Sequence, residues 1–206
     1  MGLTDYKNLG LEQFATQYHA WYNTPFRHYH NVAHANDVAD NCYIMSSQNP
    51  TVVLAALYHD AVYIAGVSEN EKWSALALTH DARTIEKLGY HVDFDMVNRA
   101  CLLIEQTTIK DHLKNARVTD PELAVLLDVD LSPLKFPYDV FFQNQRNILE
   151  ENFLDSNSID SLKKSAKFLK QFLTNREWIY HTDYARALWN QRAKENIDRF
   201  CMETGV

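Results

Sequence analysis

The feature that most constrains the fold of this chain is its scarcity of residues that break helices and form tight turns. The 206 residues include only five glycines and five prolines. β-Barrels and β-sandwiches need many tight turns, so this scarcity favours helices. No stretch shows the sustained alternation of apolar and polar residues that a half-buried strand requires. We therefore predict an all-α protein with essentially no sheet.

Apolar spacing predicts helices along the whole chain, and its length fits one domain over residues 1–206. A first helix is expected over 4–23, ended by Thr24-Pro25, and a second begins near 31–34. The segment TVVLAALYHDAVY (51–63) is apolar nearly all round, so we expect it in the middle of the core.

The later helices carry local start and stop signals. Ser68 and Glu71 have the spacing of a capping box that opens a helix over about 70–88, and Gly89 stops it. Asp93 caps the following helix, FDMVNRACLLIEQTT. Further helices are expected over 121–131, 137–153, 158–175 and 182–202.

Charge and cysteine usage exclude several classes of protein. The formal net charge of -7 argues against broad nucleic-acid binding, because counterion release needs a basic surface. The three cysteines are far apart and odd in number, which argues against a disulfide framework and favours a reducing compartment. The N-terminus does not resemble a signal peptide, and the longest apolar runs are shorter than the ~20 residues of a membrane span. We expect a cytoplasmic protein with no membrane partner.

Imidazole and carboxylate side chains occur at positions where burial is costly. His30 and His34 are four residues apart, which puts them on one helical face if the segment is helical throughout. His59-Asp60 lies within the apolar segment, and Asp130 lies in VLLDVDLSPL. A buried histidine or carboxylate must be paired or bind a metal. Imidazole and carboxylate ligands without a thiolate suit Fe, Mn, Zn or Mg.

Each of these residues also has a simpler interpretation. His59 alone is consistent with a hydrogen-bonded core histidine, and Asp60 with a partner of Arg27. Asp128 and Asp130 alone are consistent with carboxylates that flank a helix end. Only their joint occurrence, as H…HD…D in one helical chain, indicates a shared ion.

That set resembles the H…HD…D signature of the HD superfamily of metal-dependent phosphohydrolases. YHNVAHANDV (29–38) and DVDLSPL (128–134) resemble segments of the cyclic nucleotide phosphodiesterases. HDAVY…SENEKWSA (59–75), followed by LLDVDLSPL, resembles a group of small bacterial HD proteins. The resemblance covers residues 27–135 and, more loosely, the helices over 137–203.

The resemblance implies a single-domain helical bundle of the HD type and a set of metal ligands. By motif position, these ligands are His34, His59, Asp60 and Asp130. Asp130 matches better than Asp128, because it directly precedes the leucine of the D-L-S element. The ion would be Mn, Fe, Mg, Co or Zn.

The resemblance also suggests residues for catalysis and substrate binding. His30 would protonate the leaving oxygen, or would simply bond a neighbouring carboxylate. Asn31 would orient His30, and Arg27 would bind a phosphate oxygen unless it is a plain exposed arginine. Glu71 would hold a water or a second ion, or would only close the capping box. Lys110, like Lys72, is a candidate phosphate contact or a solvated side chain.

A second ion would need additional histidines between the HD pair and the final aspartate. His80, His91 and His112 all lie in that interval. His80 has a polar context that suits a surface position, whereas His112 follows the polar stretch TTIKDH, which suits a functional loop. The sequence therefore leaves the number of ions open.

The resemblance implies metal-dependent hydrolysis of a phosphate ester or anhydride, with a nucleotide or related small phosphorylated metabolite as substrate. One alternative is an HD-fold di-iron oxygenase that acts on an organophosphonate. Another is a non-catalytic, metal-bound module that senses a nucleotide. Phosphate release with added metals separates these classes of function.

Overall fold

The structure is a computed structural model that describes residues 4–114, 116–175 and 177–206. These residues form α-helices and short 3-10 helices, and they contain no strand, which confirms the predicted all-α fold. None of the helices in these ranges is both long enough and apolar enough to cross a membrane. The chain divides into two compact units, Met1–Thr108 and Ile109–Val206. The unit boundary falls inside the segment 27–135 that carries the motifs, so the single-domain organisation and its HD type stay predictions.

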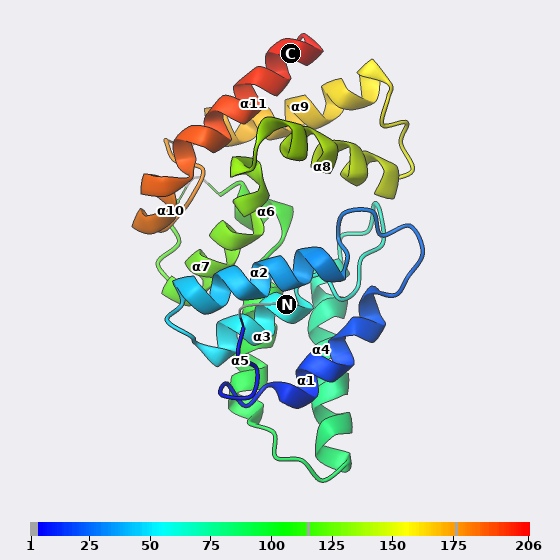
Figure 1. The fold of residues 1–206 in the computed structure, drawn as a ribbon, viewed down its shortest axis with the longest axis vertical. Helices are drawn as coiled ribbons and strands as arrows, with labels where there is room; N and C mark the ends of the chain where they lie inside the picture. Colours follow the sequence, from blue (N-terminus) through cyan, green and yellow to red (C-terminus); the bar gives the residue numbers. More distant parts are fainter. Residues whose placement is uncertain (1–3, 115, 176) are drawn as a thin grey trace. The chain divides into compact units, whose positions relative to one another are not determined.

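The first unit is built around α3, the helix predicted to lie in the core. Its elements are α1 (Glu12–Gln17), η1 (Tyr18–Tyr22), α2 (Val32–Met45), α3 (Pro50–Tyr58), α4 (Asn70–Lys87) and α5 (Phe94–Ile104). Helix α3 contacts α2, α4 and α5, and it is buried from Val52 to Tyr58 (Figure 1). An apolar helix surrounded in this way gains burial on every face.

Local capping explains where three of these helices begin. The side chain of Asn31 accepts hydrogen bonds from the backbone N–H groups at the start of α2, and Asn49 and Asp93 do the same for α3 and α5. Pro50 occupies the first turn of α3, where its missing N–H costs nothing. The predicted starts of α2 and α5 are confirmed.

The predicted helix over 4–23 is wrong in its extent. Gly10 has φ +70°, a left-handed conformation that a helix cannot contain, so α1 begins only after Leu11. The chain then continues from α1 into the tighter 3-10 turn of η1. Of the apolar residues spaced three or four apart, Leu11, Phe14 and Tyr18 are buried, whereas Trp21 is partly exposed.

The predicted capping box at the start of α4 is also wrong. Its cap position is Glu69, which makes no capping hydrogen bond with its side chain. The next residue, Asn70, closes the preceding loop instead: its side chain bonds both backbone groups of Ile64 and the carbonyl of Val67. The other end follows the prediction, because Gly89 takes φ +90° and terminates the helix.

The second unit contains the helices that follow residue 108. They are α6 (Ile109–His112), α7 (Pro121–Asp130), η2 (Ser132–Lys135), α8 (Tyr138–Glu151), α9 (Ile159–Thr174), α10 (Asp183–Leu188) and α11 (Asn190–Thr204). Helix α11 packs against α8, α9, α10 and η2 (Figure 1). The predicted helix over 182–202 is divided at Trp189, whose ring lies 3.8 Å below the Lys135 ammonium.

Candidate metal centre

Three side chains of the first unit meet at the place where α2 packs against α3. His34 lies in the first turn of α2, His59 caps the C-terminus of α3, and Asp60 follows directly. The Nε2 atoms of the two histidines are 3.3 Å apart. The Oδ2 atom of Asp60 lies 3.0 Å from His59 Nε2 and 3.6 Å from His34 Nε2. Both imidazoles are buried, whereas the carboxylate is partly exposed.

The contact on the other side of the His59 ring determines its tautomer. Nδ1 of His59 lies 2.8 Å from the carbonyl oxygen of Ala56. Because a carbonyl oxygen only accepts, Nδ1 carries a proton and donates it. In the neutral imidazole Nε2 then presents a lone pair toward Asp60, which is also an acceptor. Two lone pairs 3.0 Å apart repel unless a proton or a cation lies between them.

The separations of these atoms suit a common metal ion. Ligand atoms about 2.1 Å from one ion lie about 3.0 Å apart at right angles and about 3.4 Å apart in a tetrahedron. The three observed separations run from 3.0 to 3.6 Å. His34, His59 and Asp60 are therefore a group that can hold a metal ion, with one nitrogen or oxygen from each. Their predicted convergence is confirmed.

The fourth predicted ligand belongs to the second unit. Asp130 is the last residue of α7, and its Oδ2 atom lies 3.0 Å from Nε2 of His112. The imidazole of His112 is buried, and among the described residues its Nδ1 atom has no hydrogen-bond partner. His112 was a candidate for a second ion, and the structure pairs it with a predicted ligand. The role of Asp130 as a ligand stays a prediction.

Asp128, the other candidate for the ligand on α7, has a structural role. Asp128 is fully buried, and its two carboxylate oxygens accept hydrogen bonds from the backbone N–H groups of His181 and Thr182, at 2.6 and 2.7 Å. Both oxygens are thus engaged by the backbone that leads into α10. This favours Asp130 as the ligand from α7, in agreement with the motif.

Arg27, predicted to bind phosphate, forms hydrogen bonds to the backbone around the cluster of His34, His59 and Asp60. Its Nη1 donates to the carbonyls of His30 and Asp60, at 2.8 and 2.6 Å, and its Nη2 donates to the carbonyl of Ala61 at 2.8 Å. Nε donates to the hydroxyl of Thr24. In the described part of the chain, four of its five N–H groups are used in this way. Arg27 therefore clamps two loops together, and a direct contact with substrate stays a prediction.

The ring of Tyr22 packs against the guanidinium of Arg27, and its hydroxyl bonds the end of α3. The guanidinium lies 5.1 Å from the ring centre of Tyr22, whose hydroxyl donates to the carbonyl of Leu57 at 3.0 Å. Burial, and then the charge of Asp60, raises the pKa of the Tyr22 hydroxyl well above its usual value. Tyr22 thus remains a neutral donor that fixes the end of α3.

His30, the predicted proton donor, lies beside the cluster. Its ring stacks on Tyr63 with centres 4.1 Å apart and an interplanar angle of 21°. Its ring centre is 5.9 Å from that of His34. The sequence analysis missed Tyr63, although this aromatic residue follows the HD pair by three positions in HDAVY. The position suits His30 for proton transfer, and the transfer itself stays a prediction.

The other predicted site residues, Asn31, Glu71 and Lys110, lie at the starts of α2 and α4 and on α6. Asn31 caps α2, so it positions the backbone of His34, and its amide nitrogen donates to the carbonyl of His28. Glu71 is partly buried in the first turn of α4, and Lys110 is exposed on α6. Their predicted roles toward substrate or water stay predictions.

Two of the three histidines considered for a second ion are exposed. His80 is largely exposed, and its Nδ1 lies 3.1 Å from the carboxylate of Asp81. That buried carboxylate also accepts hydrogen bonds from Trp21 and Tyr58. His91 is exposed in the loop before α5. Only His112 contacts a predicted ligand.

No family model matches the chain, and neither a curated protein nor a solved structure shows significant similarity to it. The candidate centre therefore rests on its own geometry and on the motifs in the sequence.

Replacing Arg27 with lysine is expected to lower the free energy of unfolding by about 2–4 kcal/mol, although the charge is kept. An ammonium cannot reproduce the forked contacts to His30, Asp60 and Ala61. Urea unfolding at neutral pH measures the loss. Arg83 on α4 is a matched control, because it is an exposed arginine of the same unit. Equal midpoints for Arg27→Lys and Arg83→Lys would show that the clamp contributes nothing.

Proposed function

We propose that this protein is a metal-dependent phosphohydrolase of the HD type. The observation that carries the proposal is the meeting of His34, His59 and Asp60, in which the facing acceptor atoms of His59 and Asp60 need a cation or a proton between them. A buried imidazole and carboxylate cluster without thiolates is typical of catalytic rather than structural metal sites. The H…HD…D order of the sequence adds the reaction class.

In this proposal Asp130 supplies the fourth ligand from the second unit. Its support is the motif: the aspartate precedes the D-L-S leucine, and the other carboxylate of α7 is held by backbone N–H groups. His112 would donate a proton from Nε2 to Asp130, orienting the carboxylate as ligand-supporting histidine–carboxylate contacts do elsewhere.

The residues of the first unit would have separate roles in the reaction. A bound divalent ion supplies Lewis acidity toward a phosphoryl oxygen and activates water. His30, held in place by Tyr63, gives a proton to the departing oxygen. Arg27 keeps the loop of His30 attached to the backbone of Asp60, so that the proton donor and the ligands stay aligned.

The proposed substrate is a nucleotide or a related small phosphorylated metabolite. This class follows from the resemblance to nucleotide-hydrolysing HD enzymes. The di-iron oxygenase alternative has less support. It needs two further histidine ligands, and of the candidates His80, His91 and His112 the described contacts pair only His112 with a predicted ligand.

Metal analysis coupled to a phosphate-release screen tests the proposal. Protein purified without chelators is expected to carry a divalent metal. With Mn, Mg, Fe or Co added, it should release phosphate from at least one member of a panel of nucleotides, phosphomonoesters and phosphodiesters. A protein that binds none of these metals, or that binds metal yet turns over no member of the panel, would contradict the proposed activity.

A further inference from the structure

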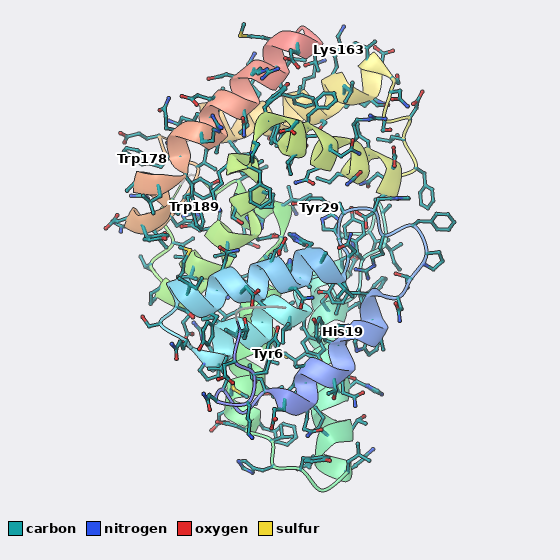
Figure 2. The ribbon with its side chains drawn as sticks, viewed as in Figure 1. Tyr6, His19, Tyr29, Lys163, Trp178 and Trp189 are labelled. Atoms are coloured by element: carbon teal, nitrogen blue, oxygen red, sulfur yellow. The ribbon has the colours of Figure 1, made fainter. Side chains whose placement is uncertain are left out.

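The second unit contains a pocket with the character of an anion site. The pocket has a volume of about 230 Å³ and lies between residues 116–117 and the segment that leads into α10. Its walls include the guanidinium groups of Arg117 and Arg186, the indole of Trp178 and the buried imidazole of His181. Trp178 lies near α10 (Figure 2). Two guanidinium groups beside an aromatic wall suit a phosphate ester, because they provide forked donors next to an apolar surface.

The positive charges of the two arginines are balanced by the carboxylate of Asp183, which an anionic ligand can replace. Asp183 lies 3.5 Å from Arg117 and 3.8 Å from Arg186, and its side chain is 86% exposed. An ion pair this exposed contributes little to stability. A phosphate dianion carries more charge than the single carboxylate and makes more hydrogen bonds, so it can displace Asp183 from both arginines.

The wall beside α10 is fixed by contacts within the unit. Arg186 Nε donates to the carbonyl of Tyr180 at 2.9 Å, and the carboxylate of Asp128 holds the backbone N–H of His181 at 2.6 Å. Because these groups are already in place, a ligand would lose little entropy in ordering them.

A negative group lines the pocket next to Trp178, and a positive group lies near it outside the lining. Glu177 also lines the pocket, but its side chain is exposed. Lys194 donates to the carbonyl of Glu177 at 2.7 Å, and its ammonium lies 5.8 Å from the ring centre of Trp178. Lys194 thus adds a positive charge beside the pocket, and within the lining two arginines outnumber the single carboxylate of Glu177, so the preferred ligand is an anion.

The volume limits the size of the ligand. Pockets for drug-sized ligands span about 300–1,000 Å³, so a pocket of about 230 Å³ suits a smaller molecule. We propose that this pocket binds the phosphate monoester of a small metabolite of sugar-phosphate size, with the phosphate between Arg117 and Arg186. This binding site shares no residue with the candidate metal cluster of the first unit and does not depend on the proposed catalysis.

Calorimetric titration of the full chain with ribose 5-phosphate tests the proposal, with ribose as the uncharged comparison. Ribose 5-phosphate is expected to bind and ribose is not. Arg117→Gln should weaken binding about 10- to 100-fold, because it removes a charge-assisted hydrogen bond. Asp183→Asn should strengthen binding several-fold, because it removes the internal competitor. Arg192→Gln changes an exposed arginine of α11 outside the pocket lining and should leave the affinity unchanged.

Binding at the metal cluster would give a different pattern. The titration is repeated with Asp60→Asn, which alters the cluster of the first unit: binding that persists there supports the pocket, and binding that disappears there overturns it. Equal affinities for the wild type and Arg117→Gln, or no binding of ribose 5-phosphate at all, would also overturn it. The opposite effects of Arg117→Gln and Asp183→Asn exclude general unfolding as their cause. Phosphate release is scored separately, so failure of the proposed activity leaves this test intact.

Discussion

Replacing Asp60 with asparagine is expected to weaken divalent-metal binding by about 100-fold or more and to reduce phosphate release to background. Loss of a residue that merely supports a ligand costs about 10- to 100-fold in affinity, so loss of a ligand costs at least as much. The substitution removes a negative charge 3.0 Å from His59 Nε2 and 3.6 Å from His34 Nε2. It also introduces an amide N–H that can donate to His59 Nε2, so the lone pair of that imidazole no longer needs a cation.

Metal content after dialysis against a defined metal buffer measures this effect. His80→Ala is the matched control, because His80 is exposed, bonds Asp81 and lies outside the candidate cluster. It should keep both its metal and its activity. His59→Ala should lose metal as Asp60→Asn does, but with lower stability, because its ring is buried and bonded to Ala56. Wild-type metal content in Asp60→Asn would remove the basis of the proposed function.

Removing the metal provides a second measurement on the same variant. An ion held at 1,000 times its dissociation constant stabilises the folded protein by about 4 kcal/mol. A chelator is therefore expected to lower the melting temperature of the wild type and to leave that of Asp60→Asn unchanged. Equal shifts in the two proteins would show that the chelator acts elsewhere.

The sequence predicted the central helix and the unusual position of His59 and Asp60 from the same apolar segment. The predicted helix over 51–63 ends earlier, at Tyr58, but its apolar residues are buried only because other helices surround it, as α2, α4 and α5 do. A histidine and an aspartate directly after such a helix are costly to bury alone, and the resemblance to the HD superfamily added His34 to them. The capping roles of Asn31 and Asp93 were equally accessible, because a cap depends on its neighbours in the chain.

The features that the sequence did not predict depend on contacts between distant segments or on single backbone angles. Arg27 donates to carbonyl groups of Asp60 and Ala61, and every residue presents a carbonyl group, so no pattern marks these acceptors. The stacking of His30 on Tyr63 requires that two loops meet. The late start of α1 follows from the positive φ of Gly10, and the sequence alone does not show whether a glycine takes that conformation.

Replacing Asp128 with alanine is expected to lower the free energy of unfolding by about 2–4 kcal/mol, an effect as large as that of Arg27→Lys but without any change in the metal cluster of the first unit. The substitution leaves two backbone N–H groups without their acceptors, that of the buried His181 and that of the partly buried Thr182. Each such group costs about 1–3 kcal/mol. The saving from no longer burying a carboxylate reduces the net loss.

The hydroxyl of Tyr180 lies in the same environment as Asp128 but donates its hydrogen bond elsewhere. Burial, and then the negative charge of Asp128, raises the pKa of the Tyr180 hydroxyl, which donates to the carbonyl of Leu131. Tyr180 therefore stays neutral and does not compensate the buried carboxylate. The compensation comes from the two backbone N–H groups at the start of α10, and these are the groups that the substitution leaves unsatisfied.

Urea unfolding of Asp128→Ala, Asp128→Asn and the exposed control Asp198→Ala on α11 measures the effect. Asparagine keeps one acceptor oxygen, so Asp128→Asn should lose less than Asp128→Ala, whereas Asp198→Ala should change stability by less than about 0.5 kcal/mol. Metal content separates a structural carboxylate from a ligand: Asp128→Asn should bind metal like the wild type, whereas Asp130→Asn should bind it weakly. If Asp128→Asn instead loses the metal while Asp130→Asn keeps it, the assignment of the two α7 carboxylates is reversed, and the motif has been aligned two residues out of place.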